Sequence, residues 1–141
     1  MKIHKFENLY PRIFWVVVMD EEDPVKLLNK FYFFVNLPGW NTINKSIEDD
    51  LNTASVEATA GCYPVQDKMT GKIGVLLVIF NSEETNTDII AHESVHIADY
   101  YYEACGCNSE DFTDGNEAYA YLVGWAAGCI ANVLIKEKKY E

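Results

Sequence analysis

The hydrophobic and polar positions of this chain first follow the pattern of buried strands. Residues 11–19 and 73–80 are continuous apolar runs, rich in β-branched and aromatic side chains. The run at residues 11–19 predicts a mostly buried strand, and the run at residues 73–80 predicts a second strand. Residues 55–65 predict a further strand, broken at Gly61. The polar sequence at residues 68–72 predicts the hairpin turn that leads into the strand at 73–80.

An acidic cluster at residues 20–23, followed by Pro24, predicts the start of a helix. Carboxylates suit the positive end of the helix dipole, and proline fits the first helical turn. A helix over residues 25–35 would align four apolar side chains on one face, namely Leu28, Phe31, Tyr32 and Val35. Residues 37–41 then predict a turn, and residues 42–53 an irregular segment with at most a short helical turn.

Two long helices are predicted in the second half of the chain. The first covers Thr87–Ala104, with N-cap candidates at residues 86–88. A loop rich in Gly, Asn, Ser and Asp covers residues 105–114, and the last helix extends from about Glu117 to residue 137 or 138. The pattern contains no repeat and no interdomain linker. It predicts a single α+β domain over residues 1–141, in which a small antiparallel or mixed sheet packs on a helical layer.

The overall charge narrows the classes of partner. The 141 residues include 11 Lys and Arg against 22 Asp and Glu, a formal net charge of −11. An acidic surface without a basic stripe repels phosphate backbones, so nucleic acid is not expected as a partner. With 49% hydrophobic residues, the chain has the composition of a folded protein.

The cysteines and the N-terminal segment predict a cytoplasmic protein. The chain has 4 cysteines, too few for a disulfide framework at this length. The spacing of Cys105 and Cys107 is not that of a zinc knuckle, which favours reduced thiols. The first seven residues lack the long apolar region of a signal peptide.

One segment has the composition of a short membrane anchor. Residues 118–135 carry no charge, include Gly124 and Gly128 in a GxxxG pattern, and precede a basic tail. A buried helix explains the same features, with the glycines permitting close helix contact. The run is at the lower length limit for a span and contains Asn132, so the buried helix is the preferred interpretation and a membrane is not expected as a partner.

The residues most suited to chemistry lie in the sequence His92-Glu93-Ser94-Val95-His96. Side chains four apart on a helix point the same way, so His92 and His96 can bind one zinc ion. Glu93 lies on the adjoining face, where a carboxylate can act as general base on a metal-activated water. The motif also arises by chance, but here it falls inside a segment with helical spacing and N-cap candidates.

A catalytic zinc site needs a third protein ligand. The preferred choice is Glu117, which opens the last helix and precedes a largely apolar run. A glutamate in a first turn is also favoured by the helix dipole alone. The remaining histidine, His4, lies near a terminus that is expected to be mobile.

The motif helix, followed by Asn116-Glu117-Ala118-Tyr119-Ala120, resembles the gluzincin zinc metallopeptidases, and in particular small single-domain versions encoded by phages and mobile elements. The resemblance covers about residues 73–125. It implies a zincin-like minimal domain that binds one Zn²⁺ through His92, His96 and Glu117, with Glu93 as the base. It also implies that the strand at 73–80 borders the cleft and pairs with an extended peptide.

The chain departs from that family at two points. Gluzincins commonly carry an acidic residue four positions after the ligand glutamate, where this chain has Tyr121. Asp99 can replace it as the residue that orients a histidine, or it is a solvated helix residue. No histidine follows His96 in the sequence, so a tyrosine would have to stabilise the oxyanion. Tyr121 is the first choice and Tyr100 the second, although tyrosines are more often packing residues.

The function expected from the sequence is zinc-dependent hydrolysis of a peptide or protein substrate. The alternative is a non-catalytic zinc-binding interaction protein with a gluzincin-like fold, in which the metal is a structural element and the acidic surface binds a partner.

Overall fold

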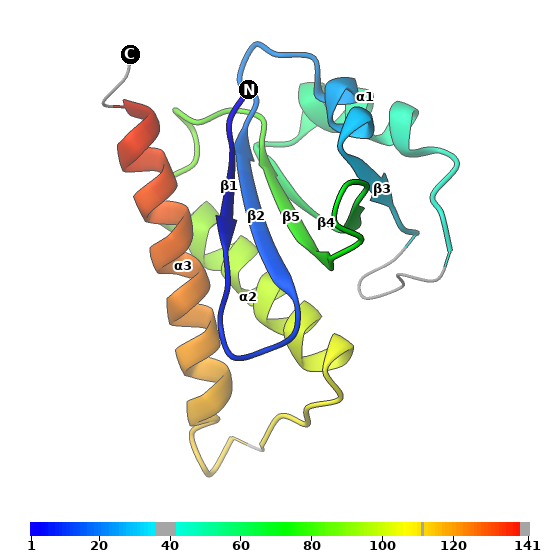
Figure 1. The fold of residues 1–141 in the computed structure, drawn as a ribbon. Helices are drawn as coiled ribbons and strands as arrows, with labels where there is room; N and C mark the ends of the chain where they lie inside the picture. Colours follow the sequence, from blue (N-terminus) through cyan, green and yellow to red (C-terminus); the bar gives the residue numbers. More distant parts are fainter. Residues whose placement is uncertain (36–41, 111, 139–141) are drawn as a thin grey trace.

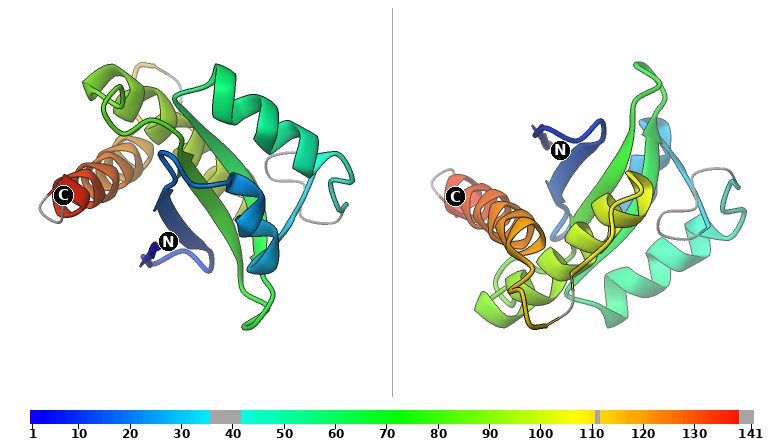
Figure 2. Two further views of the ribbon diagram at one scale, coloured as in Figure 1. Left: turned by 90° about the horizontal axis from the view of Figure 1, so that it is seen from above. Right: turned by 90° about the horizontal axis from the view of Figure 1, so that it is seen from below.

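A mixed sheet lies at the centre of the molecule, between two helical layers (Figures 1 and 2). The computed structural model describes residues 1–35, 42–110 and 112–138. The sheet has five strands in the order β1-β2-β5-β4-β3. The strands are β1 (Ile3–Phe6), β2 (Ile13–Val18), β3 (Phe31–Phe33), β4 (Ala60–Asp67) and β5 (Ile73–Ile79). The helices are the 3₁₀ helix η1 (Pro24–Asn29) and the α-helices α1 (Ile47–Glu57), α2 (Thr87–Ala104) and α3 (Glu117–Lys138).

The two apolar runs of the sequence form the central strands. β2 and β5 pair in parallel, from Ile13 opposite Gly74 to Val18 opposite Ile79. Alternate side chains reach opposite faces of a strand. The side chain of Phe14 accordingly packs in the core beneath α2 and α3, whereas that of Trp15 packs in the core beneath η1 and α1. Helices on both faces explain why these strands are continuously apolar. The α+β class is confirmed, and the sheet is covered on both sides.

The prediction of a helix over residues 25–35 is wrong. Asp23 accepts a hydrogen bond from the backbone N–H of Val25 at 3.0 Å, which caps η1, but η1 ends at Asn29. The next residues form β3 and pair antiparallel with β4. Phe31 and Phe33 are buried while Tyr32 is 47% exposed. This alternation with a period of two is that of a strand at the edge of the sheet. Pairing with β4 has outweighed the helical spacing of these side chains.

The segment at residues 42–53, expected to be irregular, contains most of α1, so the strand predicted from residue 55 begins only at Ala60. Ile47 and Leu51 are one helical turn apart and are both buried on the sheet. Three acidic side chains occupy the first turn, Glu48, Asp49 and Asp50, where the helix dipole favours negative charge. The turn expected at residues 37–41 lies outside the described residues.

The N-terminal segment is part of the sheet. β1 pairs antiparallel with β2, which the sequence did not indicate. His4 is 8% exposed, and its Nε2 lies 3.0 Å from the Glu137 carboxylate on α3. The expectation of a mobile terminus around His4 is therefore wrong, because strand pairing and this contact with α3 hold it in place.

Among the described residues, α3 is the one helix long and apolar enough to cross a membrane. Its inner face packs on the core through fully buried residues such as Ala126 and Ile130. Added Cβ atoms at Gly124 and Gly128 would meet nothing within 4 Å. The prediction that these glycines allow close helix contact within the domain is therefore wrong, since both face outward.

Alkaline pH is expected to destabilise the fold through Cys129 on α3. Burial raises the pKa of this thiol from 9.0 to about 11. Above about pH 9 the unfolded chain loses a proton that the folded chain keeps, so stability falls as the pH rises toward the folded pKa. From about pH 8 to about pH 10, the free energy of unfolding should fall by about 1 kcal/mol less in Cys129→Ala than in the wild type. Urea titrations at both pH values measure the two losses, and equal losses would contradict this role of the thiol.

Candidate metal centre

The helix that carries the motif has the bounds predicted from the sequence, Thr87–Ala104. It packs on the sheet through buried residues that recur every three or four positions, among them Ser94, Ile97 and Tyr101. His92 and His96 lie on the solvent side of this helix and are both exposed. Packing of the buried stripe therefore fixes which way the two imidazoles point.

The structure brings the two histidines together. Their Nε2 atoms lie 3.1 Å apart, and their ring centroids are 4.8 Å apart with an interplanar angle of 77°. Two nitrogens bound tetrahedrally to one zinc at about 2.0–2.1 Å lie about 3.3–3.4 Å apart. The pair fits two positions of such a site with a shift of a few tenths of an ångström.

Glu93, unlike the two histidines, lies on the buried side of α2, between α2 and β4. Its side chain is 7% exposed. The Cys62 thiol of β4 donates to Glu93 Oε2 at 3.1 Å. Burial, followed by the charge of Glu93 and this hydrogen bond, raises the pKa of the Cys62 thiol well above its usual value of 9.0. The thiol therefore stays protonated and serves as a donor to the carboxylate.

Cys62 is the site residue that sequence reasoning missed. It is 31 positions from Glu93 in the chain, and its β4 neighbours carry no motif. Its inward direction follows from strand alternation, because Cys62 shares the α2 side of β4 with Ala60. That alternation could have been used only once the start of β4 was known.

The other proposed residues are placed elsewhere. Glu117 and Tyr121 lie one turn apart on α3, as predicted, but both are exposed and Tyr121 is 76% accessible. In the described part of the chain, no group of three or more His, Cys, Asp or Glu side chains is placed to hold a metal ion. The structure therefore brings two candidate ligands together, and it does not bring Glu117 to them.

Asp99 is hydrogen-bonded to α3. None of the hydrogen bonds described joins it to a histidine. The Tyr119 hydroxyl donates to Asp99 Oδ1 at 2.6 Å. Burial, and then this bond to Asp99, raises the pKa of Tyr119 to about 12. Tyr100, the second choice for oxyanion stabilisation, is 1% exposed and lies on the buried face of α2. Its phenol has a raised pKa because of burial.

A cavity of about 600 Å³ adjoins His96. Asp99, Tyr102 and Glu103 on α2, together with residues 107–109 of the following loop, form much of its lining. The cavity borders the histidine pair without enclosing it. It leaves room for a ligand beside His96.

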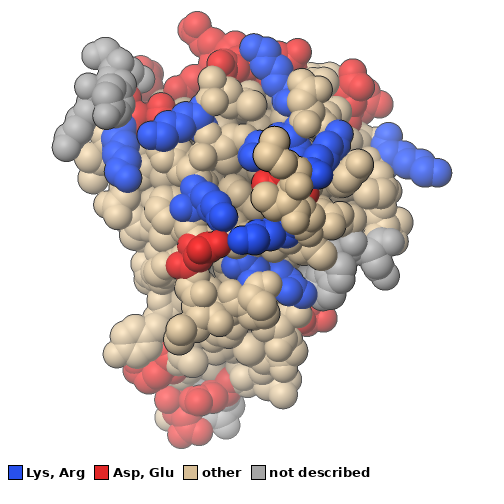
Figure 3. All heavy atoms as spheres, viewed as in Figure 1, with Lys and Arg blue, Asp and Glu red and all other residues tan. Residues whose placement is uncertain are grey.

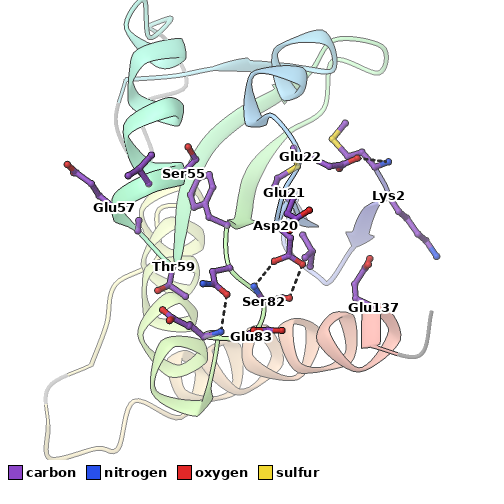
Figure 4. A pocket seen from close by; sticks show the side chains of 18 residues that line it. Lys2, Asp20, Glu21, Glu22, Ser55, Glu57, Thr59, Ser82, Glu83 and Glu137 are labelled. Atoms are coloured by element: carbon purple, nitrogen blue, oxygen red, sulfur yellow. Dashed lines mark hydrogen bonds and ion pairs between the residues drawn. The ribbon is translucent and has the colours of Figure 1, made fainter. Parts of the chain in front are cut away.

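A larger hollow of about 1000 Å³ lies at the ends of β2 and β5 (Figure 4). It contains none of the proposed site residues. Asp20 adopts a φ of 33° and accepts hydrogen bonds from the backbone N–H and the hydroxyl of Ser82 at 2.8 and 2.9 Å. Seven carboxylates line the hollow: Asp20, Glu21, Glu22, Glu57, Glu83, Glu84 and Glu137. In the view of Figure 3 acidic side chains gather at the top and bottom of the molecule, with Lys and Arg between them.

The strand expected to border a cleft is not at an edge. β5 is paired on both sides, with β2 and with β4, so it cannot add a peptide strand. Among the described residues, β3 pairs with β4 only at residues 65–67, which leaves the rest of that side of β4 without a partner strand. The Pro64 carbonyl accepts from the Phe34 N–H at 3.0 Å on that side. By alternation, the N–H and C=O of Cys62 also point toward that side. The described residues provide no partner strand for them there.

Comparison of the chain with protein-family models, with curated proteins and with solved structures finds no match.

Proposed function

We propose that this chain is a zinc-dependent peptidase in which His92 and His96 bind the metal and Glu93 is the general base. The observation that carries the proposal is the 3.1 Å separation of the two Nε2 atoms, with a buried carboxylate on the adjoining face of the same helix. When bound, zinc supplies a Lewis acid that polarises the scissile carbonyl and lowers the pKa of a coordinated water.

Glu93 would take a proton from the attacking water and later pass it to the leaving amine. Its position suits this role, because Cys62 donates to one oxygen, Oε2, and thereby orients the carboxylate. Burial of the side chain reduces competition from bulk water. Cys62 is therefore proposed as the residue that positions the base.

An extended peptide would bind along the open edge of β4. Backbone N–H and C=O groups of Cys62 would pair with it as in strand addition. The Cys62 side chain contacts Glu93, so a peptide paired at this position would pass close to the proposed base. This replaces the prediction that β5 receives the substrate.

Glu117 stays the proposed third ligand, and Tyr121 the proposed oxyanion donor, on the strength of the sequence resemblance. Both would require the first turn of α3 alone to change its orientation, because the buried residues from Leu122 onward fix the rest of the helix. The resemblance to gluzincins is likewise a proposal about the fold, as are the zincin-like architecture and the cytoplasmic location.

The alternative function is a non-catalytic zinc-binding interaction protein. The exposure of both histidines favours it, together with the lack of a third ligand beside them in the described residues. A partner protein would then complete the coordination, and Glu93 would have only a structural contact with Cys62.

Zinc binding is expected at about one ion per chain and should depend on the histidine pair. Replacing an outer residue that merely orients a ligand already costs about 10- to 100-fold in affinity, so His96→Ala should lose more than about 100-fold. Val95→Ala is the matched control, because Val95 is exposed in the same helical turn. Competition with a chromophoric chelator measures all affinities. Equal affinity in His96→Ala and the wild type would refute the site.

The same titration tests the third ligand. Glu117→Ala should weaken zinc binding by a comparable factor if Glu117 coordinates the metal. Unchanged affinity in this variant, with His96→Ala still defective, would keep the histidine pair and remove Glu117.

A further inference from the structure

The outer face of α3 is apolar and has no partner within the described chain. Added Cβ atoms at Gly124 and Gly128 would meet nothing within 4 Å, Tyr121 is 76% exposed and Ile135 is 54% exposed. No charged residue occurs from position 118 to position 135. Of the most apolar 18-residue window of this helix, 33% is buried. α3 lies at the periphery in both views of Figure 2, with no other helix or strand on its far side.

This face cannot be buried by rotating the helix within the domain. The opposite face of α3 is already used, since Ala126, Ile130 and Val133 are fully buried. Glu117, Tyr121, Gly124, Gly128 and Ile135 recur at helical spacing and, with the exposed Asn132, form one continuous outer stripe. Burying them inside the domain would expose its core.

A lipid bilayer is a poor cover for this surface. A helix with one face in a protein core cannot span a membrane, because its core side chains would have to leave the sheet. Binding flat on a bilayer would be opposed by the net charge of −11, since most biological membranes present anionic lipids. The outer face of α3 is therefore better suited to another protein surface that is also apolar.

The net charge of −11 also opposes the approach of a second copy, but the charges at the two ends of α3 are complementary when two copies lie antiparallel. The outer face begins at Glu117 and ends at Lys138, the last described residue of the helix. If two copies cross antiparallel, Glu117 of each lies beside Lys138 of the other. The same register sets Gly124 opposite Ala131, so small residues meet where the helices approach most closely. The antiparallel arrangement also opposes the two helix dipoles.

We propose that two copies of this chain associate through the outer faces of α3, packed antiparallel about a two-fold axis near its middle. A helix of 22 residues is about 33 Å long. A single helix pair of this length forms a small interface, which places the dissociation constant in the micromolar range. The proposal does not require zinc, but it excludes the proposed role of Glu117 as third zinc ligand in the same molecule. It uses Glu117 in the outward orientation that the structure shows.

The experiment is sedimentation equilibrium of the full chain in EDTA, up to about 500 µM. EDTA prevents zinc from bridging two copies through the exposed histidines. The wild type should approach the mass of two chains of 16.1 kDa each. The double variant Gly124→Leu/Gly128→Leu should dissociate at least tenfold more readily, because its side chains occupy the contact. A wild type that stays monomeric at the highest concentration overturns the proposal.

Two matched variants separate contact from folding. Gly124→Ala/Gly128→Ala increases helix propensity about as much as leucine does, but keeps the helices close, and should remain dimeric. Thr53→Leu adds the same side chain to an exposed position on α1 and should also remain dimeric. Circular dichroism and urea unfolding confirm that every variant folds. Equal dimerisation of the leucine double variant and the wild type would place the contact elsewhere.

Charge reversal tests the orientation. Glu117→Lys and Lys138→Glu should each weaken the dimer by several fold, since each places like charges together. The double reversal should restore most of the loss. A parallel dimer would show no such rescue, and absence of rescue would overturn the antiparallel arrangement.

Discussion

Gly74→Ala is expected to lower the free energy of unfolding by at least about 3 kcal/mol, at the upper end of the cost of overpacking. A Cβ at this position would overlap the backbone carbonyl of Ile13 and come within 2.8 Å of Trp15 Cζ3. The carbonyl belongs to β2 and cannot move without disturbing the parallel β2–β5 pairing. Urea unfolding followed by tryptophan fluorescence measures the loss.

Gly71→Ala is the matched control for this substitution. Gly71 lies in the adjoining turn with a φ of 74°, and an added Cβ would come no closer than 4.0 Å to a non-neighbouring residue, at Gln66 Nε2. Its cost should be limited to the left-handed backbone, about 1–2 kcal/mol. If Gly74→Ala costs no more than Gly71→Ala, the close approach of β2 and β5 at this point is wrong.

The strand at residues 73–80, which contains Gly74, shows how much of the central sheet could be predicted from the sequence. The strand at residues 73–80 is confirmed apart from its last residue, as β5, and the turn at 68–72 joins it to β4. Its continuous apolar pattern indicates burial on both faces. Pattern alone does not reveal a parallel partner, because pairing with β2 is a contact between distant parts of the chain. The glycine is the local sign of a close backbone approach.

The elements that were missed depend on such distant contacts. β3 is three residues long, and its pairing with β4 outweighed the helical spacing of its side chains. α1 has a weak pattern, with two buried residues in eleven, because it covers the sheet with a narrow stripe. β1 has a mixed burial pattern and is recognised only by its pairing with β2. Short elements carry too few periodic positions to be identified alone.

The candidate site was predicted best where it is local. His92 and His96 are neighbours because of helical geometry, which the sequence determines directly. The contact of Glu93 with Cys62 joins α2 to β4 and required the tertiary structure. The orientation of Glu117 depends on how α3 is positioned and rotated relative to α2 after the connecting residues 105–116. Helical spacing correctly placed Tyr121 beside Glu117, but it contains no information about which way their shared face points.

Glu93→Gln is expected to keep zinc and fold while lowering peptide hydrolysis by about 100- to 10,000-fold, the usual cost of losing a general base. The amide has nearly the shape of the carboxylate but cannot accept the proton of the attacking water. Hydrolysis of a diverse peptide library, by enzyme loaded with one equivalent of zinc, measures the rate. Glu103→Gln is the control, because Glu103 is an exposed carboxylate on the same helix and has no proposed chemistry.

Three outcomes of this experiment have different meanings. Cleavage by the wild type and Glu103→Gln, but not by Glu93→Gln, supports the peptidase. Equal cleavage by all three would refute Glu93 as the base and point to a contaminating protease. Zinc binding through His92 and His96 without cleavage would favour the interaction protein.

Cys62→Ala separates the two possible roles of Glu93. If the thiol positions the base, this variant should have a lower catalytic rate at unchanged zinc affinity, because Cys62 contacts the carboxylate and not the histidines. A carboxylate with only a structural role predicts lower stability and no change in rate per folded molecule.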